Sequence, residues 1–368
     1  MKPKGKPGYW MFVFVLPVIF INANVFAQAQ PEKLIFALGN PTKLSSDARF
    51  REIPSYLGYF AEEGIEVEYV PCSGSLVAIQ LVIAGKADLG NISPESVVKM
   101  KQEGVHLRTI FAGIRDYPWY FAVMDESKIT SYKQLKGKKI GISSFGSAAN
   151  IYAVSYVKES GLDPEKDVTI IPVGMGAAAA NALKTGQVDA LAFWTMAFAA
   201  MENAGYKLRY LENPECFQKL WTQGHVITEK AYKERHKPMI GFSRAVARAG
   251  LFAITNPEAT VKIWYKVNPE LKPRGTEAEV MKKFKDELHV LEVNNMSTRI
   301  DNRRVKKWGW VDRADYEAIQ DYFYSVGYLK KKLGIEKLDG CYADKEFFEQ
   351  VNNFDHQKVV NQAKNYKD

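Results

Sequence analysis

Residues 74–89 read GSLVAIQLVIAGKADL, and residues 175–190 read MGAAAANALKTGQVDA. In both stretches small residues open a helix of about three turns, which a glycine ends. The pattern Gly-x-x-Asp then leads into a short apolar run, residues 89–92 in one copy and 190–194 in the other, which is typical of a buried strand. The two stretches therefore predict two related α/β units within one chain.

The pattern extends upstream of each copy. Residues 59–64 (YFAEEG) and 156–161 (YVKESG) each end a helix before a strand, and a further strand precedes each helix. Each unit then runs strand–helix–strand–helix–strand, which favours a mostly parallel sheet with helices on both faces. Glycine-ended helices before strands recur in any α/β protein, and this explains one match easily. It explains several matches in the same order less well, so we predict an internal duplication.

Composition narrows the class of protein. The chain has 368 residues, of which 46% are hydrophobic and 25% charged, so a disordered, collagen-like or polytopic membrane protein is disfavoured. The formal charge is +8. Removal of residues 1–27 takes away three lysines and leaves 47 basic against 42 acidic residues. This mild balance predicts no nucleic-acid partner, because such binding needs a clustered basic face.

The N-terminus predicts export. Residues 1–9 carry three lysines and no acid, and residues 10–21 (WMFVFVLPVIFI) form an apolar run of 12 residues. A membrane-spanning helix needs about 20 apolar residues, so this run is too short. Small residues around Ala27 complete the pattern of a secretory signal peptide over residues 1–27, with a buried strand or an amphipathic anchor as the alternatives. Because no cysteine lies near the cleavage site, we expect a periplasmic, soluble protein without a lipid anchor.

Loops rich in Ser, Gly and Asn are expected to line a crevice between the two units. Each precedes a predicted helix, and free backbone N–H groups at helix starts suit anions and polar oxygens. The same residues also cap helices everywhere, and Ser93-Pro94-Glu95 in particular fits an ordinary capped helix start. Residues 111–118 and 212–215 are the predicted crossovers between the units. The loops are residues 43–47, 73–75, 91–95, 143–148 and 174–176.

Aromatic and basic residues suggest the nature of a ligand. Trp119 and Trp194 can wall a planar or aliphatic molecule, although core packing is the usual role of aromatics on strands. Arg115, in the first crossover, can pair with a carboxylate or sulfonate, or form an ordinary salt bridge. We expect a small organic anion, with room for an aromatic or heterocyclic body.

Catalysis has little support in the sequence. The chain has no Gly-x-Ser-x-Gly elbow and no His-Glu-x-x-His motif, so we predict no catalytic residue, no metal, no cofactor and no enzymatic activity. The three cysteines, Cys72, Cys216 and Cys341, match no zinc or Cys-x-x-Cys spacing, and their pairing stays open.

Four segments carry a resemblance to a known class. They are YLGYFAEEGIEV at 56–67, IAGKADLG at 83–90, LKGKKIGI at 135–142 and GQVDA at 186–190. In this order the chain resembles the periplasmic solute-binding proteins of the nitrate/sulfonate/taurine uptake class, whose superfamily includes binders of thiamine-pyrimidine and riboflavin precursors. The resemblance implies an α/β, two-lobed clamshell of the type II periplasmic-binding-protein fold with a helical C-terminal extension. Lobe I would hold residues 30–113 and 215–290 and lobe II residues 114–214, with residues 291–368 packing mainly on lobe I.

The same resemblance implies the substrate-binding component of an ABC importer. The protein would act as a monomer and pass its ligand to a membrane permease driven by an ATPase. A synthase of the thiamine pyrimidine and a periplasmic sensing module are the alternatives. Related synthases use a cysteine-rich motif and a sacrificial histidine, whereas the three cysteines here form no cluster. The expected ligand contacts, with Arg115 added from the residues themselves, are Ser45, Ser73, Gly74, Ser75, Asn91, Ser93, Arg115, Ser144, Gly146, Ser147, Met175 and Trp194.

Overall fold

The computed structural model describes residues 1–5, 8, 30–39, 43–214, 217, 220–296 and 305–367. Contacts separate residues 1–30 from a compact unit, Pro31–Asp368, to which the following description is confined. The predicted signal peptide lies mostly outside the described residues, and Cys216 also lies outside them. Within the part of the chain that the structure describes, no helix combines the length and apolar character needed to cross a bilayer.

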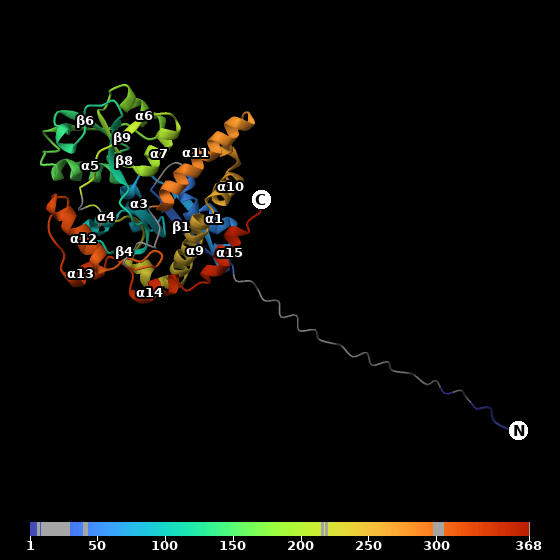
Figure 1. Ribbon diagram of the computed structural model, residues 1–368. Helices are drawn as coiled ribbons and strands as arrows, with labels where there is room; N and C mark the ends of the chain where they lie inside the picture. Colours follow the sequence, from blue (N-terminus) through green and yellow to red (C-terminus); the bar gives the residue numbers. More distant parts are fainter. Residues whose placement is uncertain are drawn as a thin grey trace. The chain divides into compact units, whose positions relative to one another are not determined.

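Two five-stranded sheets form the framework (Figure 1). The first has the strand order β2-β1-β3-β10-β4, and the second has the order β7-β6-β8-β5-β9. We call each sheet with the helices packed on it a lobe. The strands of the first lobe are β1 (Glu32–Leu38), β2 (Ile65–Pro71), β3 (Leu89–Ile92), β4 (Leu107–Ile114) and β10 (Thr222–Thr228). Those of the second are β5 (Trp119–Met124), β6 (Lys138–Ile142), β7 (Val168–Pro172), β8 (Ala190–Trp194) and β9 (Leu208–Tyr210).

The three strands of each duplicated unit are parallel, as expected from the sequence, and one antiparallel strand makes each five-stranded sheet mixed. In the first sheet β1 runs parallel to β2 and β3, but β10 runs antiparallel to β3 and β4. In the second, β6 runs parallel to β7 and β8, but β5 runs antiparallel to β8 and β9. The antiparallel strands β5 and β10 are those that follow a passage of the chain from one lobe to the other.

The duplicated pattern has a shared structural role in the two lobes. The orders β2-β1-β3 and β7-β6-β8 are equivalent, and the Gly-x-x-Asp aspartate occupies the same place in each. The Asp88 carboxylate accepts a hydrogen bond from the Ile35 backbone N–H (2.6 Å), and Asp189 accepts one from Lys139 (2.8 Å). Each aspartate thus ties the start of one strand to its central neighbour, so the motif is explained by folding alone.

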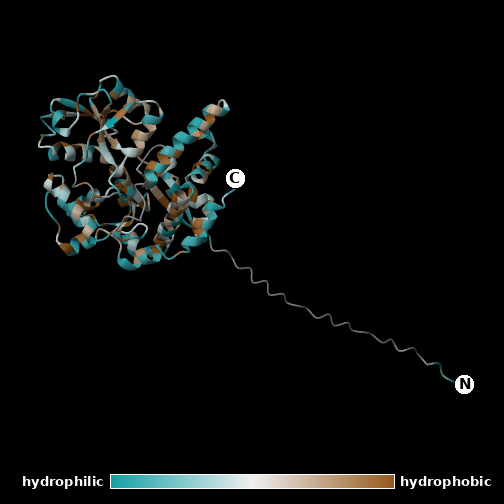
Figure 2. Cartoon of the chain, in the orientation of Figure 1, coloured by the Kyte–Doolittle hydropathy of each residue, from teal (hydrophilic) through white to brown (hydrophobic). Residues whose placement is uncertain are grey.

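Helices cover both sheets, and Figure 2 shows their outer faces to be largely hydrophilic. Gly85 (φ +67°) and Gly186 (φ +74°) adopt the left-handed conformation expected after the two equivalent helices. The α-helices of the two units are α1 (Glu52–Tyr56), α2 (Tyr59–Glu62), α3 (Ser75–Ile83), α4 (Pro94–Gln102), α5 (Ala148–Glu159), α6 (Ala177–Lys184) and α7 (Thr195–Asn203). Those after β10 are α8 (Glu229–Glu234), α9 (His236–Thr255), α10 (Pro257–Val267), α11 (Glu277–Met296), α12 (Arg313–Ser325), α13 (Ile335–Asp339), α14 (Lys345–Val351) and α15 (His356–Lys364). Short 3-10 helices are η1 (Ser45–Phe50), η2 (Tyr132–Leu135) and η4 (Pro269–Leu271).

The chain passes between the lobes twice. Residues 115–118 lead from β4 to β5, and residues 211–221 lead from β9 to β10. Helix α11 also reaches the second lobe, because the Asn203 side chain at the end of α7 donates a hydrogen bond to the Asp286 carbonyl (2.7 Å). The lobe limits proposed from the sequence remain predictions. Strand β4 includes residues 111–114, so the first crossover is shorter than the predicted 111–118.

Candidate functional site

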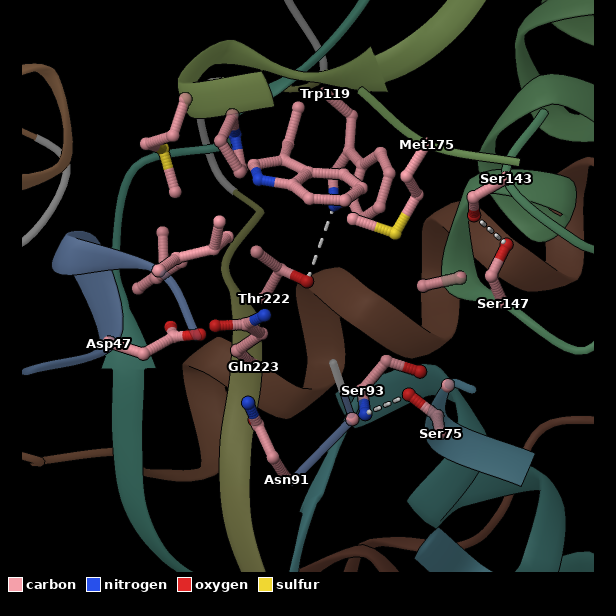
Figure 3. A pocket seen from close by; sticks show the side chains of 18 of the residues that line it. Asp47, Ser75, Asn91, Ser93, Trp119, Ser143, Ser147, Met175, Thr222 and Gln223 are labelled. Carbon is pink, nitrogen blue, oxygen red and sulfur yellow. Dashed lines mark hydrogen bonds between the residues drawn. The ribbon is translucent and has the colours of Figure 1, made fainter. Parts of the chain in front are cut away.

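A cavity of about 270 Å³ opens where the two sheets face each other (Figure 3). Its walls are the loops after β1, β2 and β3 in the first lobe and after β6, β7 and β8 in the second, together with β10. Pockets that enclose small organic ligands have volumes of roughly 300–1,000 Å³, so this cavity fits a small molecule. The position at strand ends and helix starts is the one expected for a ligand site in an α/β protein.

Five helices begin at this cavity without a capping side chain. They are α3, α4, α5, α6 and α7, and none of their N-cap residues accepts a side-chain hydrogen bond from the first turn. Among the described helices that begin elsewhere, α8, α10, α12, α14 and α15 have such a cap, whereas α1, α2, α9 and α13 also lack one. What distinguishes the cavity is that five helix starts meet at one place. The uncapped N–H groups and the positive ends of the helix dipoles therefore favour negative charge at the cavity.

An apolar wall closes the second-lobe side. The Trp119 and Trp194 rings lie on neighbouring strands with centroids 5.6 Å apart and planes at 67°, and both line the cavity. Met175 and Met196 complete this wall, and Met175 lies beside the Trp119 ring in Figure 3. Aromatic faces and polarisable thioethers suit a flat or aliphatic ligand body.

Polar side chains line the first-lobe side. Asn91 Oδ1 and Gln223 Oε1 are buried and have no hydrogen-bond partner among the described residues. Gln223 has a φ of +53°, a strained conformation for a side chain of this kind, at a position that lines the cavity. Asp47 is the one ionisable side chain among the described lining residues, and Figure 3 shows it facing Gln223. The Asp47 carboxylate gives this side of the cavity an acceptor for an N–H or O–H of a ligand, whereas the two amide oxygens are buried behind the cavity surface.

Serine hydroxyls border the helix starts. Ser75 Oγ accepts a hydrogen bond from the Ser93 backbone N–H (3.3 Å), and Ser143 donates to Ser147 Oγ (2.8 Å), as Figure 3 shows. Ser147 in turn donates to the Ser144 carbonyl (2.7 Å). The hydroxyls thus hold the loops at the cavity in place.

The two lobes touch at the rim of the cavity. Ser144 Oγ donates a hydrogen bond to the Ser73 carbonyl across the gap (3.3 Å). A Cβ added at Gly74 would lie 2.8 Å from the Gly146 carbonyl oxygen and 3.0 Å from Ser147 Cα. Glycine at position 74 therefore allows the backbones of the two lobes to approach this closely.

Nine of the twelve residues expected from the sequence line this cavity. The structure brings together Ser73, Gly74, Ser75, Asn91, Ser93, Ser144, Ser147, Met175 and Trp194. Contact of each with a ligand stays a prediction.

Ser45, Arg115 and Gly146 lie elsewhere. Ser45 is buried at the start of η1 behind the lining residues. Arg115 forms an ion pair with Asp315 (3.1 Å) and donates to the Trp310 carbonyl (2.7 Å), so its charge is already satisfied. Gly146 belongs to the contact between the lobes rather than to the cavity.

Several residues that line the cavity are not among the ligand contacts expected from the sequence. Asp47 and Ser143 lie in loops that the sequence singled out, and Trp119 was noted only as a possible wall. No sequence pattern indicates that Thr222 and Gln223 line the cavity. They reach it because β10, which follows the return from the second lobe, inserts between β3 and β4. No periodicity or motif marks that insertion.

Neither of the two described cysteines lines this cavity. Cys72 and Cys341 are both buried free thiols. Within the described ranges, no group of three or more His, Cys, Asp or Glu side chains is arranged to hold a metal ion.

A family model described as NMT1/THI5 like matches residues 54–260. The chain belongs to the NMT1/THI5-like family. This chain is similar in sequence to a curated protein, the 4-amino-5-hydroxymethyl-2-methylpyrimidine phosphate synthase of Uromyces fabae, with 27% identity over 232 residues. The match covers 58% of this chain and 65% of the relative, so the chain spans just under two thirds of that relative's length.

Solved structures establish the fold of this NMT1/THI5-like protein. The periplasmic aliphatic sulphonate binding protein SsuA of Escherichia coli has a TM-score of 0.58 at 17% identity, covering 84% of this chain and 92% of its own. The periplasmic nitrate-binding protein NrtA of Synechocystis PCC 6803 has a TM-score of 0.62 at 13% identity, covering 92% and 99%. The predicted two-lobed periplasmic-binding-protein fold is confirmed.

The prediction that the chain is not an enzyme is contradicted by the curated relative, which is named as a synthase. That prediction relied on missing elbow and metal motifs. A family can do its chemistry without either motif, so their absence was a poor guide.

Proposed function

We propose that this protein is the exported substrate-binding component of an ABC importer. It captures a small organic anion with a planar or apolar body between its lobes and delivers it, as a monomer, to a membrane permease. Membership of the family and likeness to the sulphonate- and nitrate-binding proteins support the transport role.

The observation that carries the ligand class is the set of five uncapped helix starts at one cavity. They favour an anionic group, such as a sulfonate, carboxylate or phosphate. Trp119 and Trp194 supply a surface for the ligand body, while the Asp47 carboxylate favours a ligand that also carries N–H or O–H donors. An amino-substituted heteroaromatic anion satisfies all three requirements.

The name of the curated relative favours a second candidate function. It implies formation of 4-amino-5-hydroxymethyl-2-methylpyrimidine phosphate, which combines an anionic phosphate with an aminopyrimidine ring. The same cavity would then hold that molecule as a product instead of as cargo.

Native mass spectrometry of the gently purified protein separates these functions. A stoichiometric small molecule released unchanged, with the chain at its calculated mass, supports capture and transport. A mass change of the chain itself on formation of the pyrimidine supports the synthase, in which a protein side chain is consumed. An empty protein that also binds no anion in a thermal-shift series of sulfonates, aromatic acids and pyrimidine phosphates would contradict both.

Trp194→Ala is expected to weaken ligand binding by about 10- to 100-fold, because a buried aromatic contact contributes roughly 1.5–3 kcal/mol. The fold should survive, since Trp194 is only partly buried at the end of β8. Calorimetric titration measures the affinity, and an unfolding transition at the wild-type temperature confirms the fold. Wild-type affinity in this variant would exclude Trp194 from the site.

Export predicts a processed N-terminus. The mature protein should begin near Gln28 or Gln30, which mass spectrometry of the exported protein can determine. An intact Met1 on exported material would contradict a cleaved signal peptide.

A further inference from the structure

A chain of hydrogen bonds leads from the cavity wall into the protein. The Trp119 indole N–H donates to Thr222 Oγ1 (3.4 Å), as Figure 3 shows, and the Tyr152 hydroxyl lies 3.0 Å from the same oxygen. Tyr152 also donates to Glu95 Oε2 (3.3 Å). Trp119 and Thr222 line the cavity, whereas Tyr152 and Glu95 lie behind it. These hydrogen bonds thus connect a buried carboxyl group to the surface that would meet a ligand.

This series of hydrogen bonds also crosses from one lobe to the other. Glu95 lies in the first turn of α4 and Thr222 begins β10, both in the first lobe. Trp119 begins β5 and Tyr152 lies on α5, both in the second lobe. A change in the hydrogen bonds of Glu95 therefore changes the hydrogen bonds of residues in both lobes.

Glu95, which the sequence places in an ordinary helix start, has an unusual environment. Its side chain is fully buried, and Oε1 has no hydrogen-bond partner among the described residues. Burial raises the pKa of Glu95 to about 7, and hydrogen bonds from Ser93 and Tyr152 oppose this rise only in part. The carboxyl group can therefore be neutral or ionised near neutral pH.

The titratable groups that face Glu95 are tyrosine hydroxyls. They come from α5, from the segment before β5, from α12 and from the residues after it, and burial raises the pKa of each, so that all stay neutral near pH 7. Lys99, on α4 itself, lies over the Tyr328 ring with Nζ 5.0 Å from its centroid. The tyrosines are Tyr117, Tyr152, Tyr316 and Tyr328.

The protonation state of Glu95 restricts the direction of the hydrogen bonds. An ionised carboxylate only accepts, so Tyr152 donates to it and must accept the proton of Thr222. Thr222 Oγ1, which already accepts from Trp119, then has one lone pair for the ligand. A neutral carboxyl can donate to Tyr152, which then donates to Thr222. The hydroxyl proton of Thr222 is then free to point into the cavity.

We propose that Glu95 is a positioning residue that determines, through Tyr152, whether Thr222 offers the ligand a hydrogen-bond donor or an acceptor. Proton uptake at Glu95 thereby selects between ligands by their hydrogen-bonding edge. This inference rests on the proposed function, because it needs a ligand in the cavity that Thr222 lines.

We call the hydrogen-bonded path from Glu95 through Tyr152 to Thr222 the relay. Titration calorimetry with 4-amino-5-hydroxymethyl-2-methylpyrimidine phosphate as the probe, at pH values from about 6 to about 8, tests it. The affinity of the wild type, divided by that of Tyr152→Phe, should change by about fivefold to tenfold across this range. Titration of the probe itself is common to both proteins and cancels in the ratio. Glu95→Gln and Thr222→Val should show the profile of Tyr152→Phe, while Thr222→Ser, which keeps the hydroxyl, should show that of the wild type. Parallel profiles of the wild type and Tyr152→Phe would overturn the relay.

A ligand-free readout separates failure of the relay from failure of the proposed function. In infrared difference spectra between the wild type and Glu95→Gln, the band of a protonated carboxyl should disappear as the pH rises through about 7. The tyrosine ring band should shift with it, and Tyr152→Phe should remove that shift. If no protein binds the probe but this coupled titration is present, the choice of ligand is wrong and the relay stands. A carboxyl that is ionised throughout, or that titrates without the tyrosine, would overturn the relay whether or not a ligand binds.

Discussion

Gly74→Ala is expected to weaken ligand binding by about 100-fold, equivalent to about 2.7 kcal/mol, while the protein stays folded. Gly74 has a φ of +130°, and its added Cβ would lie 2.8 Å from the backbone oxygen of Gly146 in the opposing lobe. Because the obstacle is backbone, it cannot move aside as a side-chain tip can. The lobes must separate at the rim, which breaks the hydrogen bond from Ser144 to the Ser73 carbonyl. Titration calorimetry gives the affinity, and small-angle scattering with ligand present shows whether the lobes close.

Gly146→Ala provides a matched control on the other side of the same contact. A Cβ at Gly146 would meet no atom within 4 Å, so this variant should retain wild-type affinity. Gly85→Ala controls for backbone strain alone, since Gly85 has a φ of +67° and open space around it. Wild-type affinity in Gly74→Ala, or an equal loss in Gly146→Ala, would show that closure at this rim does not control binding.

His225 is expected to make the protein sensitive to acid. It is completely buried in the first lobe, and neither ring nitrogen has a hydrogen-bond partner among the described residues. Aromatic rings surround it, with centroids 4.7 Å away for Phe50 and 5.0 Å for Phe36. Burial, and to a smaller extent the nearby Arg49 cation, lower the pKa of His225 to about 3.

The direction of the pH effect follows from this depressed pKa. The unfolded chain binds a proton on His225 below about pH 6.5, whereas the folded protein does not do so until about pH 3. The stability is therefore complete above pH 6.5 and is lost as the pH falls, by about 1.4 kcal/mol per pH unit in the steep region. Between the two pKa values the total loss is on the order of 5 kcal/mol.

His225→Phe should remove this loss. At about pH 5 the variant should be more stable than the wild type by roughly 2 kcal/mol relative to the difference at about pH 8, because no proton can bind at this position. Urea unfolding at the two pH values measures the difference. His356→Gln, which changes an exposed histidine, should leave the pH dependence as in the wild type. If His225→Phe keeps the wild-type slope, His225 does not cause the acid sensitivity.

Much of the fold could be predicted because its signals are local. The Gly-x-x-Asp pattern identified two equivalent strand–helix units, and the structure shows Asp88 and Asp189 each accepting a backbone hydrogen bond from the central strand of its unit. The serine- and glycine-rich loops were recognisable because a helix start needs small or hydrogen-bonding residues. Parallel strands bring those loops to one end of a sheet, so most lining residues could be anticipated before any contact was known.

The charge and the hydrogen-bonding groups of the cavity could not be predicted from local sequence patterns. Arg115 looked available to an anion, yet the fold places Asp315 beside it. Glu95 fitted an ordinary helix start, yet helices from both lobes bury it completely. In each case the deciding neighbour comes from a distant part of the chain, and a local pattern carries no information about it.

The sequence by itself determined the duplicated α/β units, the helix starts around a shared crevice and the family to which they belong, because these depend on residues a few positions apart. The tertiary structure alone decided that β10 inserts between β3 and β4 and brings Thr222 and Gln223 to the cavity. It also decided that Gly74 meets Gly146 and that Glu95 connects to Thr222 through Tyr152. The physical reason is that burial and hydrogen-bond partners arise from packing between segments far apart in the chain, which no local preference specifies.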